Sequence, residues 1–274
     1  MARFSELTGP TVPAEPEVVT RIDAGQRRRR FWFRVQFVLV WVVLIGLLVG
    51  ALWASDKIDP SFIGTWAPFI LAGAGLTIII CAGSIVLATG LALVGAIARL
   101  SPNPIIYSVA SLYVSIVRGT PLLVQIFFIY FALPQLGIVL PALPAGIIAL
   151  GFNYGAYMTE IFRAGIQAVP RGQREAAEAL AMPEGLVMRR IVMPQAIRIV
   201  VPAIGNEFIA MIKDSALVST ISVTELLWRA SSVGNQNFRT LETLLIAALV
   251  YWLLTMVFSL FQERLERRMA RSDR

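Results

Sequence analysis

The chain has 274 residues, of which 57% are hydrophobic, one is cysteine and none is histidine. A lone cysteine cannot form an internal disulfide, and the lack of histidine removes the commonest proton shuttle and metal ligand, so metal and thiol chemistry are not expected. The only lysines are Lys57 and Lys213, and no Gly-x-x-x-x-Gly-Lys segment occurs, so the chain has no phosphate-binding loop of its own. We therefore expect no bound metal and no cofactor.

Long apolar runs dominate the chain. A helix of roughly 20 apolar residues is long enough to span the hydrocarbon core of a bilayer. The sequence predicts an all-α integral membrane protein with six transmembrane helices. The predicted spans cover residues 35–54, 66–98, 100–133, 136–159, 191–212 and 243–262.

The basic residues are unevenly placed along the chain. Most of the 24 Lys and Arg lie before the first apolar run, between the fourth and fifth runs, or after the sixth. Basic residues collect on the cytoplasmic side of a membrane. The pattern predicts that both termini and the polar segment around Glu175 are cytoplasmic, and it argues against a nucleic-acid partner.

The first part of the chain is polar and then strongly apolar. Residues 1–30 contain three prolines, show little apolar periodicity and end in the basic run Arg27–Arg30, so we predict a disordered cytoplasmic tail that enforces orientation. Residues 31–55 predict an additional N-terminal transmembrane helix. Because this run continues into a charged loop without a cleavage site of small residues, we interpret it as an anchor.

The third run is too long for one straight crossing, because about thirty helical residues reach about 45 Å against a core of about 30 Å. We therefore expect the run to start in the inner interface, with Arg118 in the inner third of the bilayer. The segment Arg118-Gly119-Thr120-Pro121 predicts a kink, since proline removes a backbone donor. Arg118 either faces protein or water, or snorkels from a tilted helix; both interpretations stay open.

The polar segment near Glu175 is the longest one between apolar runs, at about thirty residues, although such connections are usually short. Pro170 is placed to open a helix, and the alanines at 176, 177 and 179 would give it a surface of low relief. We interpret the segment as a docking element for a partner. The alternative is an interfacial amphipathic helix that only closes the loop.

Polar side chains recur on single faces within the predicted spans. Asn153, Tyr157 and Glu160 share one helical face, and a carboxylate within a membrane is costly unless it faces a partner or water. Asn206 shares a face with Lys213, as Glu207 does with Asp214. These groups either line a pathway or form ion pairs, Glu160 with Arg163 or Arg118 and Lys213 with Asp214. The candidate pathway residues are Arg118, Thr120, Asn153, Tyr157, Glu160, Asn206 and Glu207.

Several motifs together resemble a known family. Glu175-Ala176-Ala177, followed by Ile191, Met193 and Pro194, is similar to the signature of permease subunits of binding-protein-dependent ABC importers. Two departures are Ala181, where the family has glycine, and Met193, where it has leucine. The polar amino acid branch is suggested by residues 118–125, 160–166, 169–173 and 213–219, and the resemblance covers roughly residues 66–268.

The resemblance implies a five-helix permease core over residues 66–268, with the N-terminal helix as an addition and a cytoplasmic coupling helix near residues 170–182. It implies a transporter subunit of the bacterial inner membrane and no enzyme. The implied partners are a cytoplasmic ATP-binding subunit, a second permease of the same or a sister chain, an extracytoplasmic amino-acid-binding protein, a polar amino acid and membrane lipid. The implied coupling residues are Arg171, Gly172, Gln173, Glu175, Ala176, Ala177 and Ala181.

The sequence favours neither of two other classes of function. A proton- or sodium-coupled secondary carrier would need no docking helix, and no internal repeat of the kind common in such carriers is visible. An intramembrane enzyme is disfavoured because no nucleophile, base and metal set converges in the chain. From charge alone, Glu160 and Arg118 are the groups that would neutralise an amino acid's ammonium and carboxylate.

Overall fold

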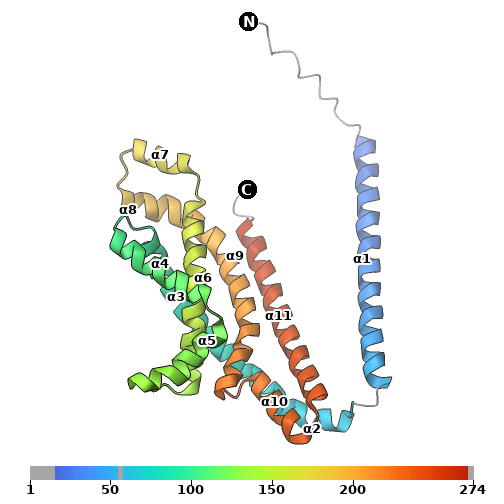
Figure 1. The fold of residues 1–274 in the computed structure, drawn as a ribbon. Helices are drawn as coiled ribbons and strands as arrows, with labels where there is room; N and C mark the ends of the chain where they lie inside the picture. Colours follow the sequence, from blue (N-terminus) through green and yellow to red (C-terminus); the bar gives the residue numbers. More distant parts are fainter. Residues whose placement is uncertain (1–15, 55–57, 271–274) are drawn as a thin grey trace. The chain divides into compact units, whose positions relative to one another are not determined.

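The protein is described by a computed structural model that covers residues 16–54 and 58–270, and its regular elements there are all helical (Figure 1). The chain forms two compact units, Met1–Pro60 and Ser61–Arg274. The longer helices are α1 (Pro16–Ala54), α2 (Pro60–Leu71), α3 (Gly73–Arg99), α4 (Pro104–Gly119), α6 (Ala142–Gln167), α9 (Met193–Asp214), α10 (Leu226–Asn237) and α11 (Thr240–Ala270). The shorter elements are α5 (Leu122–Phe127), α7 (Arg171–Ala179), α8 (Glu184–Val187), π-helical turns at Phe128–Ala132 and Met188–Val192, and 3-10 turns at Leu133–Leu136 and Ser215–Ile221.

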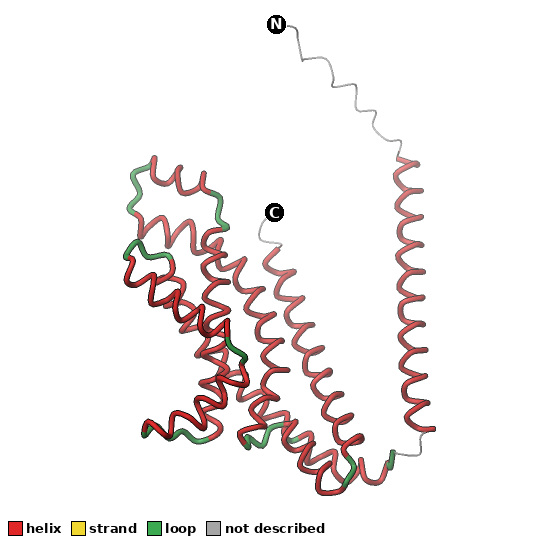
Figure 2. The backbone as a smooth tube through the Cα atoms, viewed as in Figure 1, coloured by secondary structure: helices red, strands yellow, loops and turns green. Residues whose placement is uncertain are grey.

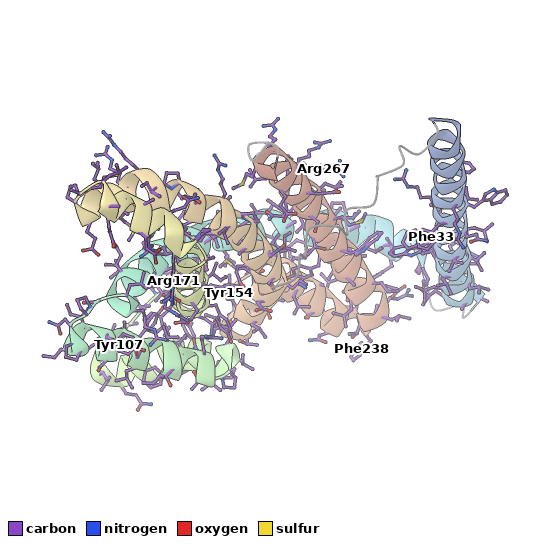
Figure 3. The ribbon with its side chains drawn as sticks, turned by 90° about the horizontal axis from the view of Figure 1, so that it is seen from above. Phe33, Tyr107, Tyr154, Arg171, Phe238 and Arg267 are labelled. Carbon is purple, nitrogen blue, oxygen red and sulfur yellow. The ribbon has the colours of Figure 1, made fainter. Side chains whose placement is uncertain are left out.

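The first unit consists mainly of α1. Apolar side chains are exposed all round the helix from Phe31 onward, as Phe33 is in Figure 3, and a helix that is apolar on every side suits a lipid environment. The helix begins at Pro16, inside the segment that the sequence predicted as a disordered tail. Arginine, glutamine and alanine are good helix formers, which accounts for helix over residues 16–30. Residues 1–15 of the predicted tail lie outside the described residues.

The predicted number of six spans is not confirmed. Within the described residues, four helices are long and apolar enough to cross a membrane, and a fifth span results if α4 and the segment Leu122–Leu136 count together. The helix α6 has the length of a span, at 26 residues, but it carries Asn153, Tyr154, Tyr157 and Thr159. These polar groups lower the mean hydropathy of α6. They are tolerated there because α6 packs against protein on several sides.

The second unit is built around the pair α3 and α6. Helix α6 also contacts α4, α5 and α9, so it lies at the centre of the unit. Close approach depends on small residues: a Cβ at Gly155 would lie 2.8 Å from the Tyr113 hydroxyl and 2.9 Å from the Leu91 Cβ. The buried core here includes Ile80, Cys81, Ala88, Leu150, Met158, Met211 and Ile212.

The third predicted span is broken where the sequence predicted a kink. Helix α4 ends at Gly119, α5 begins at Leu122, and the two are bent by 108°. Pro121 occupies the N-cap of α5 in extended geometry, which ends the first helix. The expected depth of Arg118 is therefore not supported, because it assumed a straight helix to Leu133.

The short helix α10 is anchored by a fully buried carboxylate at its start. Glu225 Oε1 accepts a hydrogen bond from the Trp228 backbone N–H at 2.8 Å, as an N-cap side chain does. Its Oε2 accepts from the Tyr251 hydroxyl at 2.6 Å and from Thr77 Oγ1 at 3.3 Å. One side chain thus joins α10 to α3 and α11. At the other end of α10, Phe238 is 95% exposed and lies at the edge of the unit in Figure 3.

The polar segment between α6 and α9 stands at one end of the second unit. Figure 2 shows α7 as a short helix held between two loops, at the end opposite α10. The chain then turns back through α8 and a π-helical turn that runs directly into α9. Helix α7 is therefore connected to the spans on both sides.

Candidate functional site

Helix α7 lies where the sequence predicted a docking helix. Ala177 is 2% exposed and packs on a small cluster that includes Ile166, Val187 and Val192, so it faces inward and not outward as its neighbours do. The expected surface of three alanines is corrected to two, Ala176 and Ala179. The exposed side chains of this region include Arg171, Gln173, Glu175, Ala176, Ala179, Leu180 and Ala181, and Gly172 is also exposed.

Two polar contacts fix α7 to the spans. Arg174 Nη2 donates to the backbone carbonyl of Ile166 at 3.1 Å and so satisfies a carbonyl in the last turn of α6. Gln195 Nε2, in the first turn of α9, donates to Gln173 Oε1. A force on the exposed face of α7 therefore reaches both α6 and α9.

The end of α7 adopts a left-handed turn at Ala181, with φ of 53°. The Met182 N–H donates to the Ala177 carbonyl at 3.1 Å, which is the six-residue bond of a Schellman cap. Alanine, unlike the glycine that the family has at this position, resists a positive φ. The cap bond overrides the preference of alanine, at a cost of about 1 kcal/mol.

We predict that Ala181→Gly stabilises the protein by about 1 kcal/mol, because glycine adopts positive φ without steric cost. Ala179→Gly, two residues earlier and within the helix, is the matched control and should destabilise by a similar amount. Thermal unfolding of the two purified variants measures both effects. Equal effects of the same sign would show that the conformation of residue 181 does not matter.

A second group of polar residues surrounds the break between α4 and α5. Gln125 Nε2 donates to the Val117 carbonyl at 2.8 Å and to the Thr120 carbonyl and hydroxyl at 3.1 and 2.9 Å. Asn153 Nδ2 of α6 donates to Gln125 Oε1 at 3.1 Å. Thr120 and Asn153, both predicted from the sequence, therefore meet through Gln125, which that prediction omitted. Gln125 replaces backbone hydrogen bonds that the break removes.

Arg118 and Glu160 do not form a pair. The Arg118 guanidinium lies 5.2 Å from the centre of the Tyr157 ring, a cation–π contact. Glu160 Oε1 accepts from Arg99 Nε at 3.1 Å, and its Oε2 accepts from Arg163 Nη2 at 2.6 Å. The predicted contact with Arg163 is present, the one with Arg118 is not, and Arg99 was not predicted as a partner.

The Arg99 side chain joins three helices. It also donates to Ser111 Oγ of α4, and its guanidinium lies 4.9 Å from the centre of the Tyr107 ring. Arg99 itself ends α3, while Glu160 belongs to α6. The carboxylate of Glu160 is therefore held in a cluster that ties α3, α4 and α6 together.

Acidic groups occupy one side of α9. The Tyr154 hydroxyl of α6 donates to Asp214 Oδ2 at 2.8 Å. The predicted pair between Lys213 and Asp214 is absent from the described residues, where no ion pair of either residue is found. Glu207 lies two turns before Asp214 and is partly exposed, and Asn206 is exposed. Tyr154 and Asp214 were not among the predicted site residues.

Comparison with known proteins gives the family. Residues 90–271 match the family of binding-protein-dependent transport system inner membrane components. The chain belongs to this family. The matched region contains α7, the break between α4 and α5, and all of α9, so each group described above lies within the family domain. The family is a transport component, which confirms the prediction of a permease and not an enzyme.

The relatives of this inner membrane component include named permeases. It is 38% identical over 229 residues to the L-cystine transport system permease protein TcyB of Bacillus subtilis (strain 168), covering 83% of this chain and 96% of the relative. It is 38% identical to the arginine transport system permease protein ArtQ of the same organism, covering 75% and 94%.

Solved structures agree with the fold. A crystal structure of an amino acid ABC transporter with histidines matches with a TM-score of 0.74 and 39% identity, covering 77% of this chain and 99% of that chain. The MetNI methionine ABC transporter matches with a TM-score of 0.61 at 17% identity, which supports the fold alone. The predicted all-α membrane permease fold is confirmed.

Proposed function

We propose that the chain is the permease subunit of an ATP-driven importer for a polar amino acid. In this proposal a cytoplasmic ATPase docks on α7, an extracytoplasmic binding protein delivers the substrate, and a second permease, identical or a sister, completes the complex. The named relatives carry cystine and arginine, which supports an amino acid as cargo. The chain itself has no phosphate-binding loop, so the energy comes from the ATPase.

The geometry of α7 is the observation that carries the docking part. Its inner face is buried through Ala177, while Glu175, Ala176 and Leu180 remain exposed at the end of the unit. A loop that only connects two spans does not need a rigid helix bonded to both of them. A helix on which a partner docks does need such rigid attachment. We assign Arg171, Gly172, Gln173, Glu175, Ala176 and Ala181 to the docking face, with Ala177 as its internal support.

The pathway is proposed to run past α9 and the break between α4 and α5. Glu207 and Asp214 lie two turns apart on α9, Asp214 accepts a hydrogen bond from Tyr154 of α6, and neither carboxylate forms an ion pair within the described residues. A pair of this kind suits the ammonium group of an amino acid. Arg118 and Tyr157 offer a cation and an aromatic face, and Thr120, Asn153 and Asn206 offer hydrogen bonds.

Both termini and α7 are proposed to be cytoplasmic in a bacterial inner membrane. Basic residues are concentrated in the first half of α1, around α7 and at the end of α11, as the charge rule for cytoplasmic segments requires. Reporter fusions after Gln173 and Arg274 should report the cytoplasm, and one after Gly234 the exterior. An external signal at Gln173 would overturn ATPase docking on α7.

Reconstitution tests the function itself. We expect vesicles that contain the permease, its ATPase and its binding protein to take up a polar amino acid only with internal ATP. Vesicles with the permease alone should show no uptake in a proton or sodium gradient. Gradient-driven uptake by the permease alone would identify a secondary carrier and refute the proposal.

A further inference from the structure

Helices α9 and α11 meet at an unusually close contact between Gly205 and Gln262. A Cβ at position 205 would overlap the Oε1 and Cδ atoms of Gln262 and lie 2.8 Å from its Nε2. The Gln262 side chain is largely buried, with 8% of it exposed. The amide of Gln262 therefore fills the space that a side chain at position 205 would need.

The same amide is bonded to the backbone of α9. Gln262 Nε2 donates to the Pro202 carbonyl at 2.6 Å and to Glu266 Oε1 at 2.9 Å. Pro202 lies inside α9 and has no N–H to donate, so the helix lacks the bond from residue 202 to the carbonyl of residue 198, in the turn before Pro202. Helices bend most readily at such positions. Gln262 thus holds α9 directly after the turn that lacks this bond.

The position of this turn along the chain gives the clamp its importance. The part of α9 before Pro202 follows directly from α7, α8 and the π-helical turn, and its first turn bonds to Gln173. The part after Gly205 carries Asn206, Glu207 and Asp214. Along α9, movement of α7 therefore passes through the turn from Pro202 to Gly205 before it reaches the acidic groups.

We propose that α9 pivots at Pro202, and that Gln262, which is seated on the turn from Pro202 to Gly205, is the positioning residue that fixes the angle of the helix. Movement of α7 then changes the positions of the acidic groups of α9 only while the amide of Gln262 remains seated on this turn. The inference rests on the proposed function, because it assigns a route from the docking helix to the pathway. Gln262 belongs to neither the docking face nor the pathway.

The test compares transport with ATP hydrolysis in the same reconstituted complex. Gly205→Ala displaces the amide, and Gln262→Ala removes it. We expect each variant to lower the number of substrate molecules taken up per ATP hydrolysed by about tenfold, an ordinary size for coupling between sites. Assembly with the ATPase and thermal stability should remain close to wild type. Gly90→Ala is the matched control, because a Cβ at Gly90 meets nothing within 4 Å.

The double variant Gly205→Ala/Gln262→Ala separates a pivot from simple packing. The new methyl group at position 205 then occupies space that the shortened residue 262 has vacated, so the helices can pack closely again. The pivot requires the hydrogen bond from the Gln262 amide to the Pro202 carbonyl. The double variant lacks this bond, so its coupling should stay low. Recovery of wild-type coupling would overturn the pivot and show that only volume matters.

A third variant keeps the proposal testable if Gly205→Ala does not fold. If Gly205→Ala fails to assemble, Gln262→Asn leaves Gly205 unchanged and shortens the side chain by one methylene, which withdraws the donor from the Pro202 carbonyl. Low coupling in this variant supports the pivot, and wild-type coupling refutes it. If the wild-type complex itself shows no ATP-driven uptake, the proposed function fails; if it transports and the variants couple normally, only the pivot fails.

Discussion

Glu175→Arg is expected to lower ATP-driven uptake by about tenfold or more, because a reversed charge at a protein interface costs several kcal/mol when it meets a complementary surface. Glu175 is exposed on α7, outside the spans, so the variant should insert into the membrane and have the thermal stability of the wild type. Binding of the ATPase should weaken in parallel. Uptake into vesicles and co-purification of the ATPase measure the two effects.

Glu263→Arg is the matched control for this experiment. Glu263 is an exposed acidic residue near the end of α11, where its only ion pair within the described residues is with Arg267 of the same helix. An exposed pair of this kind contributes little to stability. The control should transport normally. If Glu175→Arg also transports and binds the ATPase normally, α7 is a plain connector and the docking proposal is wrong.

Local signals in the sequence are sufficient for the elements on which these predictions depend. Glycine at position 119 and proline at position 121 act on their own backbone, so the amino-acid sequence alone locates the break between α4 and α5. Pro170 and the run of helix-forming residues after it likewise predicted α7, which begins at Arg171. Such signals require no knowledge of distant parts of the chain.

Partners distant in sequence could not be obtained in this way. Arg99 and Glu160 are 61 residues apart, and their contact depends on how α3 packs against α6. Tyr154 and Asp214 are 60 residues apart and meet for the same kind of reason. The close contact at Gly205 cannot be predicted without the position of α11. A helical face can be read from spacing, but what lies opposite that face is decided by tertiary packing.

The conformation of Ala181 illustrates a different limit. Backbone preference alone argues against a left-handed alanine, since such a conformation costs about 1–2 kcal/mol. Within the folded chain, the cap bond from Met182 to Ala177 and the burial of Ala177 outweigh this preference. A local rule was thus overridden by contacts that close the turn between α7 and α8.

Glu160→Gln is expected to destabilise the complex and to leave its transport activity per folded molecule unchanged. The carboxylate holds Arg99 and Arg163, and all three side chains are mostly shielded, with 18 to 29% exposed. Removing the charge leaves two partly buried guanidinium groups without their counter-ion, which we expect to cost about 2 kcal/mol. Thermal unfolding and uptake normalised to folded complex measure the two quantities separately.

The two arginines allow a sharper test, because they differ in what they join. Arg163 lies one turn from Glu160 on the same helix, so Arg163→Gln should have a small effect, whereas Arg99→Gln should cost nearly as much as Glu160→Gln. The double variant Arg99→Gln/Glu160→Gln should then be less destabilised than the sum of the single variants, since neither charge is left without the other. A pathway role for Glu160 predicts the opposite pattern. Uptake would fall in Glu160→Gln at normal stability, and removing Arg99 would not restore it.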